Sequence, residues 1–430
     1  MNLYSVFQKY PIICTDSRQA SSDSIFFALR GENFDANAFA AKALENGCKF
    51  AVIDDEKYAT DERYIVVENV LTALQDLARF HRQQMKAIVI GITGTNGKTT
   101  TKELVAAVLK ERYKVIYTQG NLNNHIGVPL TLLKIKAEHE FAIVEMGANH
   151  IGEIKTLAEI ACPDYGIITN VGKAHLEGFG SFEGVLKTKA ELYDFILKKG
   201  KGIFLNGDNE NLMQMARSLV FTRKERSIVS YSLIDGADVR GKIKSCSPFL
   251  EMRIVTNQVF FVTTHLIGSY NAENILAAVA IGNYFGVKTE RIKAGINNYK
   301  PTNNRSQFVE TESNKLVIDA YNANPSSMNF AIRNFAEINA ENKTLILGDM
   351  LELGEQSLAE HQEIVDLIEK LNFTNVFLTG ENFLETKNSF KCFENVDELE
   401  KHLLTNKITE NYVLIKGSRG MKLEKIINLL

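Results

Sequence analysis

The sequence predicts an α/β protein of three domains, covering residues 1–83, 84–300 and 301–430. The chain has 430 residues, and at about 100–200 residues per domain this length allows two to four domains. Short apolar strands alternate with helices from residue 87 onward and again after residue 307, as in parallel sheets covered by helices. The polar, turn-forming segment PTNNRSQ lies between these two stretches and is typical of a linker.

The elements follow from the local pattern in each domain. In the first domain we expect strands within 24–30, 50–54 and 64–68 and helices within 39–47 and 72–85. In the second we expect strands within 87–92, 141–146, 165–170 and 202–206, helices within 100–113, 151–160, 184–199 and 271–286, and a β-rich segment over 227–264. In the third we expect strands within 315–321, 344–350, 375–380 and 412–417, forming a second doubly wound unit.

The composition argues against several classes of protein. A net charge of -3 and a pI of about 6.3 give no general reason to expect nucleic-acid binding. Five cysteines without a CxxC pair indicate reduced thiols rather than disulfides or a zinc site. No signal peptide is recognised, and the apolar windows are too short to span a bilayer. We therefore expect a cytoplasmic protein without membrane insertion.

The segment GITGTNGKTTTKE has the context of a phosphate-binding loop, because an apolar strand precedes it and a helix follows it. Gly94 and Gly97 allow backbone N–H groups to approach phosphate oxygens. Lys98 can reach the outer phosphates, and the Thr99 hydroxyl can bind Mg²⁺. Ile92 stands where the strict GxxxxGK[ST] pattern has glycine. The candidate ATP-binding residues of the loop are Gly94, Thr95, Asn96, Gly97, Lys98, Thr99 and Thr100.

Other polar side chains follow or lie near the predicted strands of the same sheet. Glu145 ends the strand FAIVEM, where a carboxylate beside a phosphate loop suits Mg²⁺. His175 lies just past YGIITN, and the helix GVLKTKAELYDF carries Lys187 and Lys189. By position alone, each has a simpler interpretation. Glu145 could be a solvated residue at a strand end, His175 could be structural, and Lys187 and Lys189 could form an exposed cationic helix face. The loop itself leaves kinase, GTPase, motor and ligase open.

Eight segments in chain order resemble the Mur ligase family. They are TGTNGKTTTKE, GNLNNHIGVPLTLL, VEMGANHIGEI, NVGKAHLEGFGS, KTKAEL, IDAYNANPSSM, LGDMLELGEQS and KGSR. The resemblance extends from about residue 15 to residue 419. The loop is shared with all Mur ligases and with folylpolyglutamate synthases. YNANPSSM and LGDMLELGE are more specific to the members that add D-alanyl-D-alanine (D-Ala-D-Ala).

The resemblance implies a UDP-sugar-binding domain, a central ATPase domain and a C-terminal Rossmann-like domain. It implies ATP-dependent amide formation in peptidoglycan precursor synthesis. The carboxylate of UDP-N-acetylmuramoyl-tripeptide (UDP-MurNAc-tripeptide) attacks ATP, and the amine of D-Ala-D-Ala then attacks the resulting acyl phosphate. ATP and Mg²⁺ are the implied cosubstrate and cofactor. We expect a monomer, and the third residue of the acceptor peptide is not readable from the sequence.

The resemblance also assigns roles to the residues of the central domain. Lys98, His175 and Lys189 are the implied catalytic residues. Thr99 and Glu145 would bind one Mg²⁺, and His175 would help to hold a second. Lys189 matches the family lysine that CO₂ carbamylates, which would turn a cation into a carboxylate-like metal ligand.

Further residues match the nucleotide and substrate sites of the family. Asn271, Asn274, Arg305 and Asp319 are the implied additional ATP contacts, although Tyr270 stands where the family often has histidine. N-capping of a helix is the alternative role for Asn271. The implied substrate-binding residues are Ser17, Arg18, Gly31, Asn123, Asn124, Tyr321, Asn322, Asn324, Lys416 and Arg419, with Ser418 beside the last two. The family commonly has Asp-Gly-His where this chain has Asp-Ala-Asn at residues 35–37.

Three alternatives remain open at this point. A sister Mur ligase or folylpolyglutamate synthase would run the same chemistry on another amine, and YNANPSSM argues against it. A P-loop kinase or regulatory NTPase would need no amine at all. A non-catalytic binding protein would not be expected to keep the whole set of candidate catalytic residues.

Overall fold

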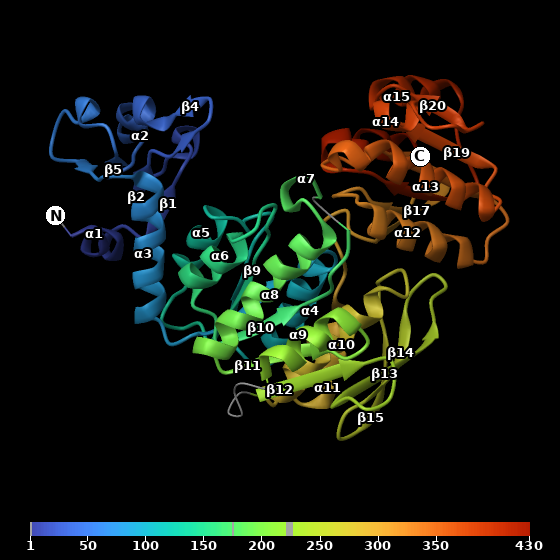
Figure 1. The fold of residues 1–430 in the computed structure, drawn as a ribbon. Coiled ribbons are helices and arrows are strands. Elements are labelled where there is room, and N and C mark those ends of the chain that lie inside the picture. The colour runs from blue at the N-terminus through green and yellow to red at the C-terminus, as the bar shows by residue number, and fades with distance from the viewer. Residues whose placement is uncertain (1, 174–175, 221–226) are drawn as a thin grey trace.

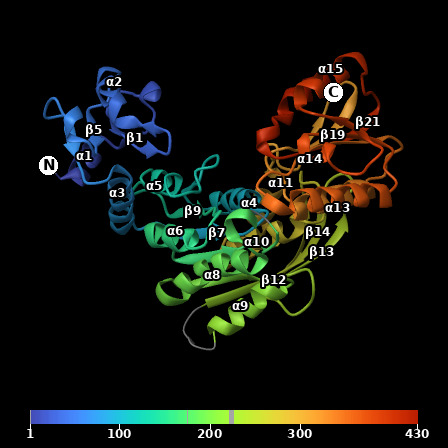
Figure 2. The same cartoon turned by 45° about the horizontal axis from the view of Figure 1, so that its top comes forward.

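Three α/β domains follow one another along the chain (Figure 1). The structure is a computed structural model that describes residues 2–173, 176–220 and 227–430. The first and third domains lie on opposite sides of the central one, and both views show this arrangement (Figures 1 and 2). The predicted α/β architecture with parallel sheets is confirmed. The boundaries at residues 83 and 300 stay predictions.

The first domain is built on a four-stranded parallel sheet of order β1-β2-β5-β6, with a small β3-β4 hairpin beside it. Three of these strands lie in the predicted segments. Strands β1, β3 and β4 were not predicted, since they have two or three residues and lie outside a longer apolar run such as the one around β6. The elements are α1 (Leu3–Lys9), β1 (Ile12–Cys14), β2 (Ser24–Phe27), β3 (Arg30–Gly31), β4 (Phe34–Asp35), α2 (Ala40–Glu45), β5 (Phe50–Ile53), β6 (Tyr64–Val66) and α3 (Val70–Gln84).

The central domain has a nine-stranded sheet of order β15-β14-β13-β12-β11-β10-β7-β9-β8. All neighbours from β8 to β13 are parallel, and β13, β14 and β15 are antiparallel. The strands are β7 (Ile88–Thr93), β8 (Val115–Tyr117), β9 (Phe141–Glu145), β10 (Tyr165–Ile168), β11 (Gly202–Asn206), β12 (Ser227–Ser232), β13 (Val239–Ser245), β14 (Glu251–Val255) and β15 (Val259–Thr263). The helices are α4 (Lys98–Lys110), α5 (Gly127–Leu132), α6 (Glu153–Ala161), α7 (Leu176–Phe179), α8 (Phe182–Lys199), α9 (Glu210–Val220), α10 (Asn271–Tyr284) and α11 (Thr289–Asn298).

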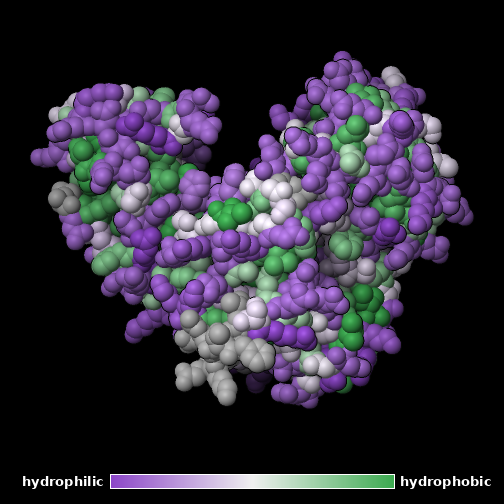
Figure 3. Space-filling model, viewed as in Figure 1, coloured by the Kyte–Doolittle hydropathy of each residue, from purple (hydrophilic) through white to green (hydrophobic). Residues whose placement is uncertain are grey.

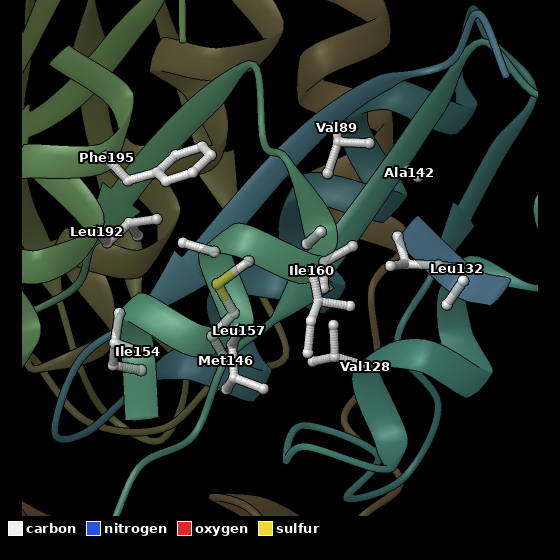
Figure 4. Close-up of a cluster of buried hydrophobic side chains, with 14 of the residues drawn as sticks. Val89, Val128, Leu132, Ala142, Met146, Ile154, Leu157, Ile160, Leu192 and Phe195 are labelled. Atoms are coloured by element: carbon white, nitrogen blue, oxygen red, sulfur yellow. The ribbon is translucent and has the colours of Figure 1, made fainter. Parts of the chain in front are cut away.

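Strand β7 is buried on both faces, which explains its continuous apolar sequence. Val89 packs into a core that includes residues of α6 and α8, and Figure 4 shows this cluster. Ile90 and Ile92 point to the other face and pack into the core formed with α4 and α10. Full burial of each such side chain contributes about 1.5–3 kcal/mol. Because β9 and β10 flank β7, the loop after β7 opens between their carboxyl ends.

The third domain has a sheet of order β16-β17-β21-β18-β19-β20, parallel except for the β16-β17 pair. Asp319 at the end of β17 is paired in register with Lys416 at the end of β21. The strands are β16 (Gln307–Glu310), β17 (Asn314–Asp319), β18 (Lys343–Gly348), β19 (Asn375–Thr379), β20 (Lys391–Phe393) and β21 (Asn411–Lys416). The helices are α12 (Pro325–Glu337), α13 (Ser357–Lys370), α14 (Glu381–Leu384) and α15 (Val396–Thr405).

The surface of the molecule is hollowed between the first and third domains (Figure 3). Helix α3 leads from the first domain into the central one and packs against α5 and α6. Within the described ranges, no helix combines the length and apolarity needed to cross a bilayer.

Candidate active site

A cavity of about 1050 Å³ lies where the central and third domains meet. It is lined by the loops that follow β7, β9 and β10 and by the carboxyl ends of β17 and β21. Segments more than 300 residues apart in the sequence therefore face one space. Its lining includes the predicted site residues Thr95, Asn96, Gly97, Lys98, Thr100, Asn123, Asn124, Glu145, Asn271, Asn274, Arg305, Asp319, Tyr321, Asn322, Asn324, Lys416 and Arg419.

The loop between β7 and α4 has the backbone that its glycines predict. Gly94 and Gly97 have φ values of +143° and +77°, which side-chain-bearing residues rarely adopt. A Cβ on Gly94 would lie 2.0 Å from the Thr169 hydroxyl oxygen, and one on Gly97 would lie 2.6 Å from Asn274 Oδ1. The N-cap residue of α4 is Gly97, which has no side chain to cap the helix, so the first N–H groups of α4 are available to an anion in the cavity.

Lys98 lies folded back on the loop that precedes it. Its Nζ donates hydrogen bonds to the carbonyl oxygens of Gly94 and Thr95, at 2.8 and 2.9 Å. Burial lowers the pKa of Lys98 to about 8; Arg305 adds repulsion, whereas Glu145 acts in the opposite direction. The ammonium is thus poorly hydrated and positioned to exchange carbonyl partners for phosphate oxygens.

Glu145 ends β9 with its side chain almost fully buried beside the loop. Its Oε1 accepts hydrogen bonds from Thr99 Oγ1 at 3.2 Å and from Asn123 Nδ2 at 2.9 Å. Its Oε2 is buried without a hydrogen-bond partner among the described residues, and Lys102 Nζ lies 3.6 Å from it. A carboxylate oxygen without a hydrogen bond next to a hydroxyl is a donor set that suits Mg²⁺.

The two candidate lysines of helix α8 lie in different environments. Lys187 is exposed, whereas Lys189 is only 2% exposed and its Nζ lies 5.6 Å from the centre of the Phe179 ring. Burial lowers the pKa of Lys189 to about 7, and repulsion from Lys98 acts in the same direction. A substantial fraction of this lysine is therefore neutral near physiological pH. His175 lies outside the described residues, and its metal-binding role stays a prediction.

The two predicted asparagines of α10 form a chain of hydrogen bonds behind the loop. Asn274 Oδ1 accepts from Thr101 Oγ1 at 3.0 Å, and Asn274 Nδ2 donates to Asn271 Oδ1 at 2.9 Å. Asn271 Nδ2 donates to the Ile267 carbonyl at 2.8 Å. Asn271 is the first residue of the helix rather than its cap, and no side chain caps this end. The alternative capping role for Asn271 is therefore wrong.

The third domain presents charged residues to the cavity from the ends of its strands. Lys416 Nζ forms a 2.6 Å ion pair with Asp319, although the lysine is only 1% exposed. The centre of the Tyr321 ring lies 3.8 Å from the Arg305 guanidinium carbon and 5.4 Å from the guanidinium carbon of Arg419. Two guanidinium groups thus share one aromatic ring in the lining of the cavity.

Direct contacts join the third domain to the loop side of the cavity. Asn324 Nδ2 donates to Asn96 Oδ1 at 2.9 Å, while Asn324 Oδ1 caps α12 by accepting from the Ser327 N–H. Lys173 forms a 2.8 Å ion pair with the buried Glu360 of α13. In this structure Asn324 therefore bridges the two domains, and its predicted contact with substrate stays a prediction.

The predicted residues of the first domain do not line this cavity. Arg18 is exposed and paired with Asp16 at 2.8 Å. Ser17 begins a 3₁₀ turn, and Gly31 lies in the β3-β4 hairpin. The first domain lies across the open gap from the third (Figure 3).

The sequence pattern does not single out several residues that line the cavity or support the phosphate loop. Asn170 follows β10 and holds the loop, because its Oδ1 accepts from the Asn96 N–H at 2.9 Å. Its position after an apolar strand was a usable signal. Lys102 carried no such signal, since only the folded helix brings it to Glu145. Others in the lining are His125, Asn149, Asn209, Tyr270, Glu273, Ser306, Ser326 and Phe330.

Three family models match this chain, one in each domain. The "Mur ligase family, catalytic domain" matches residues 9–82, the "Mur ligase middle domain" matches 92–282, and the "Mur ligase, glutamate ligase domain" matches 304–419. A Bacillus subtilis protein named UDP-N-acetylmuramoyl-tripeptide–D-alanyl-D-alanine ligase is 36% identical, with 96% of this chain and 92% of that protein covered.

Solved structures agree with this match. MurF from Acinetobacter baumannii superposes with a TM-score of 0.86 at 33% identity, covering 97% of this chain and 92% of that one. MurF ligase from Thermotoga maritima, solved in complex with ADP, gives a TM-score of 0.86 at 25% identity over 100% of this chain and 98% of the other.

Proposed function

The chain belongs to the Mur ligase family, and we propose that it joins D-Ala-D-Ala to UDP-MurNAc-tripeptide, converting ATP to ADP and phosphate. The observation that carries this proposal is the single cavity between the phosphate loop and the strand ends of the third domain. Lys98 and Glu145 line this cavity from the central domain, and Arg305 and Lys416 line it from the segment after α11 and from the end of β21. The extent of the likeness to ligases of this name supports the choice of substrates.

The proposed chemistry activates a carboxylate before an amine attacks it. The tripeptide carboxylate attacks the γ-phosphorus of ATP, the bond to ADP breaks, and an acyl phosphate forms. The amine of D-Ala-D-Ala then attacks the acyl carbon, loses a proton, and phosphate leaves. The first step brings two anions together, and the second develops negative charge on the acyl oxygen and the leaving phosphate, so positive groups aimed at these oxygens lower both barriers.

Different residues of this chain would bind the phosphates, neutralise their charge and hold the metal. Lys98 and the N-terminus of α4 would hold the ATP phosphates, and Arg305 would neutralise charge from the third domain. Thr99 and Glu145 would hold Mg²⁺, which when bound offsets charge on phosphate oxygens. Asn271, Asn274 and Asp319 remain the proposed further ATP contacts, and His175 a proposed ligand of a second Mg²⁺.

The acceptor substrate needs contacts in more than one domain. We assign the UDP-sugar to Ser17, Arg18 and Gly31 of the first domain and to Asn123 and Asn124 of the central one. The peptide end and the dipeptide are assigned to Tyr321, Asn322, Asn324, Lys416 and Arg419. Closing the gap between the first and third domains would bring these two sets to one substrate. We propose that the enzyme is a cytoplasmic monomer.

The test is phosphate release from Mg²⁺·ATP with UDP-MurNAc-tripeptide, with and without D-Ala-D-Ala. We expect sustained release only with both substrates, and UDP-pentapeptide as the product by mass spectrometry. Release with another amine would indicate a sister ligase or a folylpolyglutamate synthase. Phosphate release without any amine would indicate an NTPase, and ADP formation without phosphate release would indicate a kinase. Each of these results would overturn the proposal.

We propose that Lys189 is carbamylated in the active enzyme. The reaction needs a neutral amine, which the lowered pKa of Lys189 provides, and the product carboxylate would face the cationic site. Intact mass spectrometry near neutral pH with bicarbonate should show one added CO₂ in the wild type and none in Lys189→Ala. Activity of Lys189→Ala should fall about 10²-fold or more. Lys187→Ala, on the exposed face of the same helix, is the matched control.

Wild-type-like activity of Lys189→Ala at all Mg²⁺ and bicarbonate concentrations would contradict this assignment. Retention of the added mass in Lys189→Ala would mean that another group is modified.

A further inference from the structure

Helix α4 carries an adjacent pair, Lys102 and Glu103, that the proposed reaction does not use. Lys102 is only 1% exposed, and its Nζ lies 3.6 Å from Glu145 Oε2 and 3.7 Å from Glu103 Oε1. A buried ammonium without such partners would be strongly unfavourable. The lysine therefore lies between the proposed metal-binding carboxylate and a second carboxylate on its own helix.

Glu103 in turn holds the segment that joins the central and third domains. Its Oε2 accepts a 2.6 Å hydrogen bond from the Tyr299 hydroxyl. Asn303 Nδ2 donates to both carboxylate oxygens of Glu103, at 3.0 and 3.1 Å. Tyr299 and Asn303 belong to residues 299–306, which we call the linker, between α11 and β16. Burial raises the pKa of Tyr299, so its hydroxyl remains a hydrogen-bond donor.

The linker also carries Arg305, the proposed cation of the third domain. Arg305 is two residues beyond Asn303, and its guanidinium stacks on Tyr321. Its Nε is buried without a hydrogen-bond partner in the described part of the chain. The orientation of Arg305 therefore depends on how the linker is held.

We propose that Lys102 and Glu103 are positioning residues that couple metal binding at Glu145 to the linker and thereby to Arg305. The coupling rests on the proposed function, since it takes Glu145 as the carboxylate that binds Mg²⁺. One ammonium between two carboxylates responds to a divalent cation on either of them. A cation at Glu145 repels the Lys102 ammonium toward Glu103. This changes the electrostatic potential at the Glu103 carboxylate, which accepts the hydrogen bonds of Tyr299 and Asn303.

The first test measures hydrogen exchange of the linker in substrate-free protein. Glu103→Gln removes the carboxylate charge and one of two equivalent acceptor oxygens, so exchange over 299–306 should be about tenfold faster. Tyr299→Phe deletes only the hydroxyl and should give a smaller increase. Glu111→Gln at the other end of α4, where Glu111 pairs with Arg291 at 3.3 Å, is the matched control and should leave the linker unchanged.

The second test adds Mg²⁺·ADP. In the wild type it should slow linker exchange, whereas in Lys102→Met the linker should no longer respond although nucleotide still binds. In kinetics, Glu103→Gln should lower kcat more than it raises the KM for ATP, because the charge that Arg305 is proposed to neutralise grows as the phosphoryl group is transferred.

Wild-type linker exchange in both Glu103→Gln and Tyr299→Phe would overturn the inference, as would an unchanged response to Mg²⁺·ADP in Lys102→Met. Faster exchange throughout α4 as well as the linker would indicate general destabilisation and would also overturn it. The exchange experiments on substrate-free protein need no turnover. Failure of the ligase assay and failure of the coupling are therefore seen separately.

Discussion

Replacing Lys98 by alanine is expected to lower kcat/KM for ATP-dependent ligation by about 10³-fold. The reason is that its ammonium is held on the carbonyls of Gly94 and Thr95, at the entrance to the proposed phosphate site. The lowered pKa shows that the charged form is disfavoured in the folded, substrate-free protein. Removing the Lys98 ammonium should therefore leave the midpoint temperature of unfolding unchanged or slightly raised. Phosphate release and thermal unfolding measure the two effects.

Two variants act as comparisons for Lys98→Ala. Lys134→Ala removes an exposed lysine of the same domain and should leave the activity unchanged. Lys98→Arg keeps the charge, but a planar guanidinium does not replace a compact ammonium, so little activity should return. An alanine variant that stays within about tenfold of wild-type activity would contradict the proposed role of Lys98.

Replacing Glu145 by glutamine is expected to raise the Mg²⁺ concentration needed for half-maximal activity at least about tenfold. It should also lower the maximal rate, because the amide cannot match the carboxylate as a ligand of a hard cation. The change leaves Lys102 with Glu103 as its remaining close carboxylate, so some loss of stability is also expected. A Mg²⁺ titration of phosphate release measures the first effect.

Glu138→Gln is the matched control for Glu145→Gln. Glu138 is an exposed glutamate of the same domain, paired with Lys114 at 3.4 Å. It should change neither the Mg²⁺ requirement nor the rate. An unchanged Mg²⁺ requirement in Glu145→Gln would show that the metal is held elsewhere.

Most of the fold could be predicted because its strands are short, apolar and regularly separated by helices. The strand before the phosphate loop and the helix after it are examples, since strand, glycines and helix are adjacent in the sequence. Strands β1, β3, β4, β8, β16 and β20 were not predicted, because each has only two to four residues and little alternation. Strand β6 is equally short but lies in the continuous apolar run YIVV, which made it recognisable. The pairing order of the sheets was also unpredictable, since it depends on long-range packing rather than on local pattern.

A site residue could be predicted where a side chain of suitable chemistry stands at a position that the local pattern already marks as a ligand-binding position. Glu145 was found because a carboxylate ends a buried strand beside the phosphate loop. Asn324 shows the limit: its motif suggested a substrate contact, which stays a prediction, but nothing local showed that its side chain caps α12 and reaches Asn96. The sequence could not show this contact, because the two residues are 228 positions apart.

A glycine-rich loop with phosphate-binding spacing, set on a parallel sheet, can be read from the sequence alone, and the motifs point to the Mur ligase family. Glycines, a lysine and a threonine at fixed spacing are local properties, and so are apolar strands. The position of Lys102 between two carboxylates and the contacts of Glu103 with the linker became visible only in the folded chain. Burial and charge pairing of this kind arise between segments that come together only when the helices, sheets and domains pack.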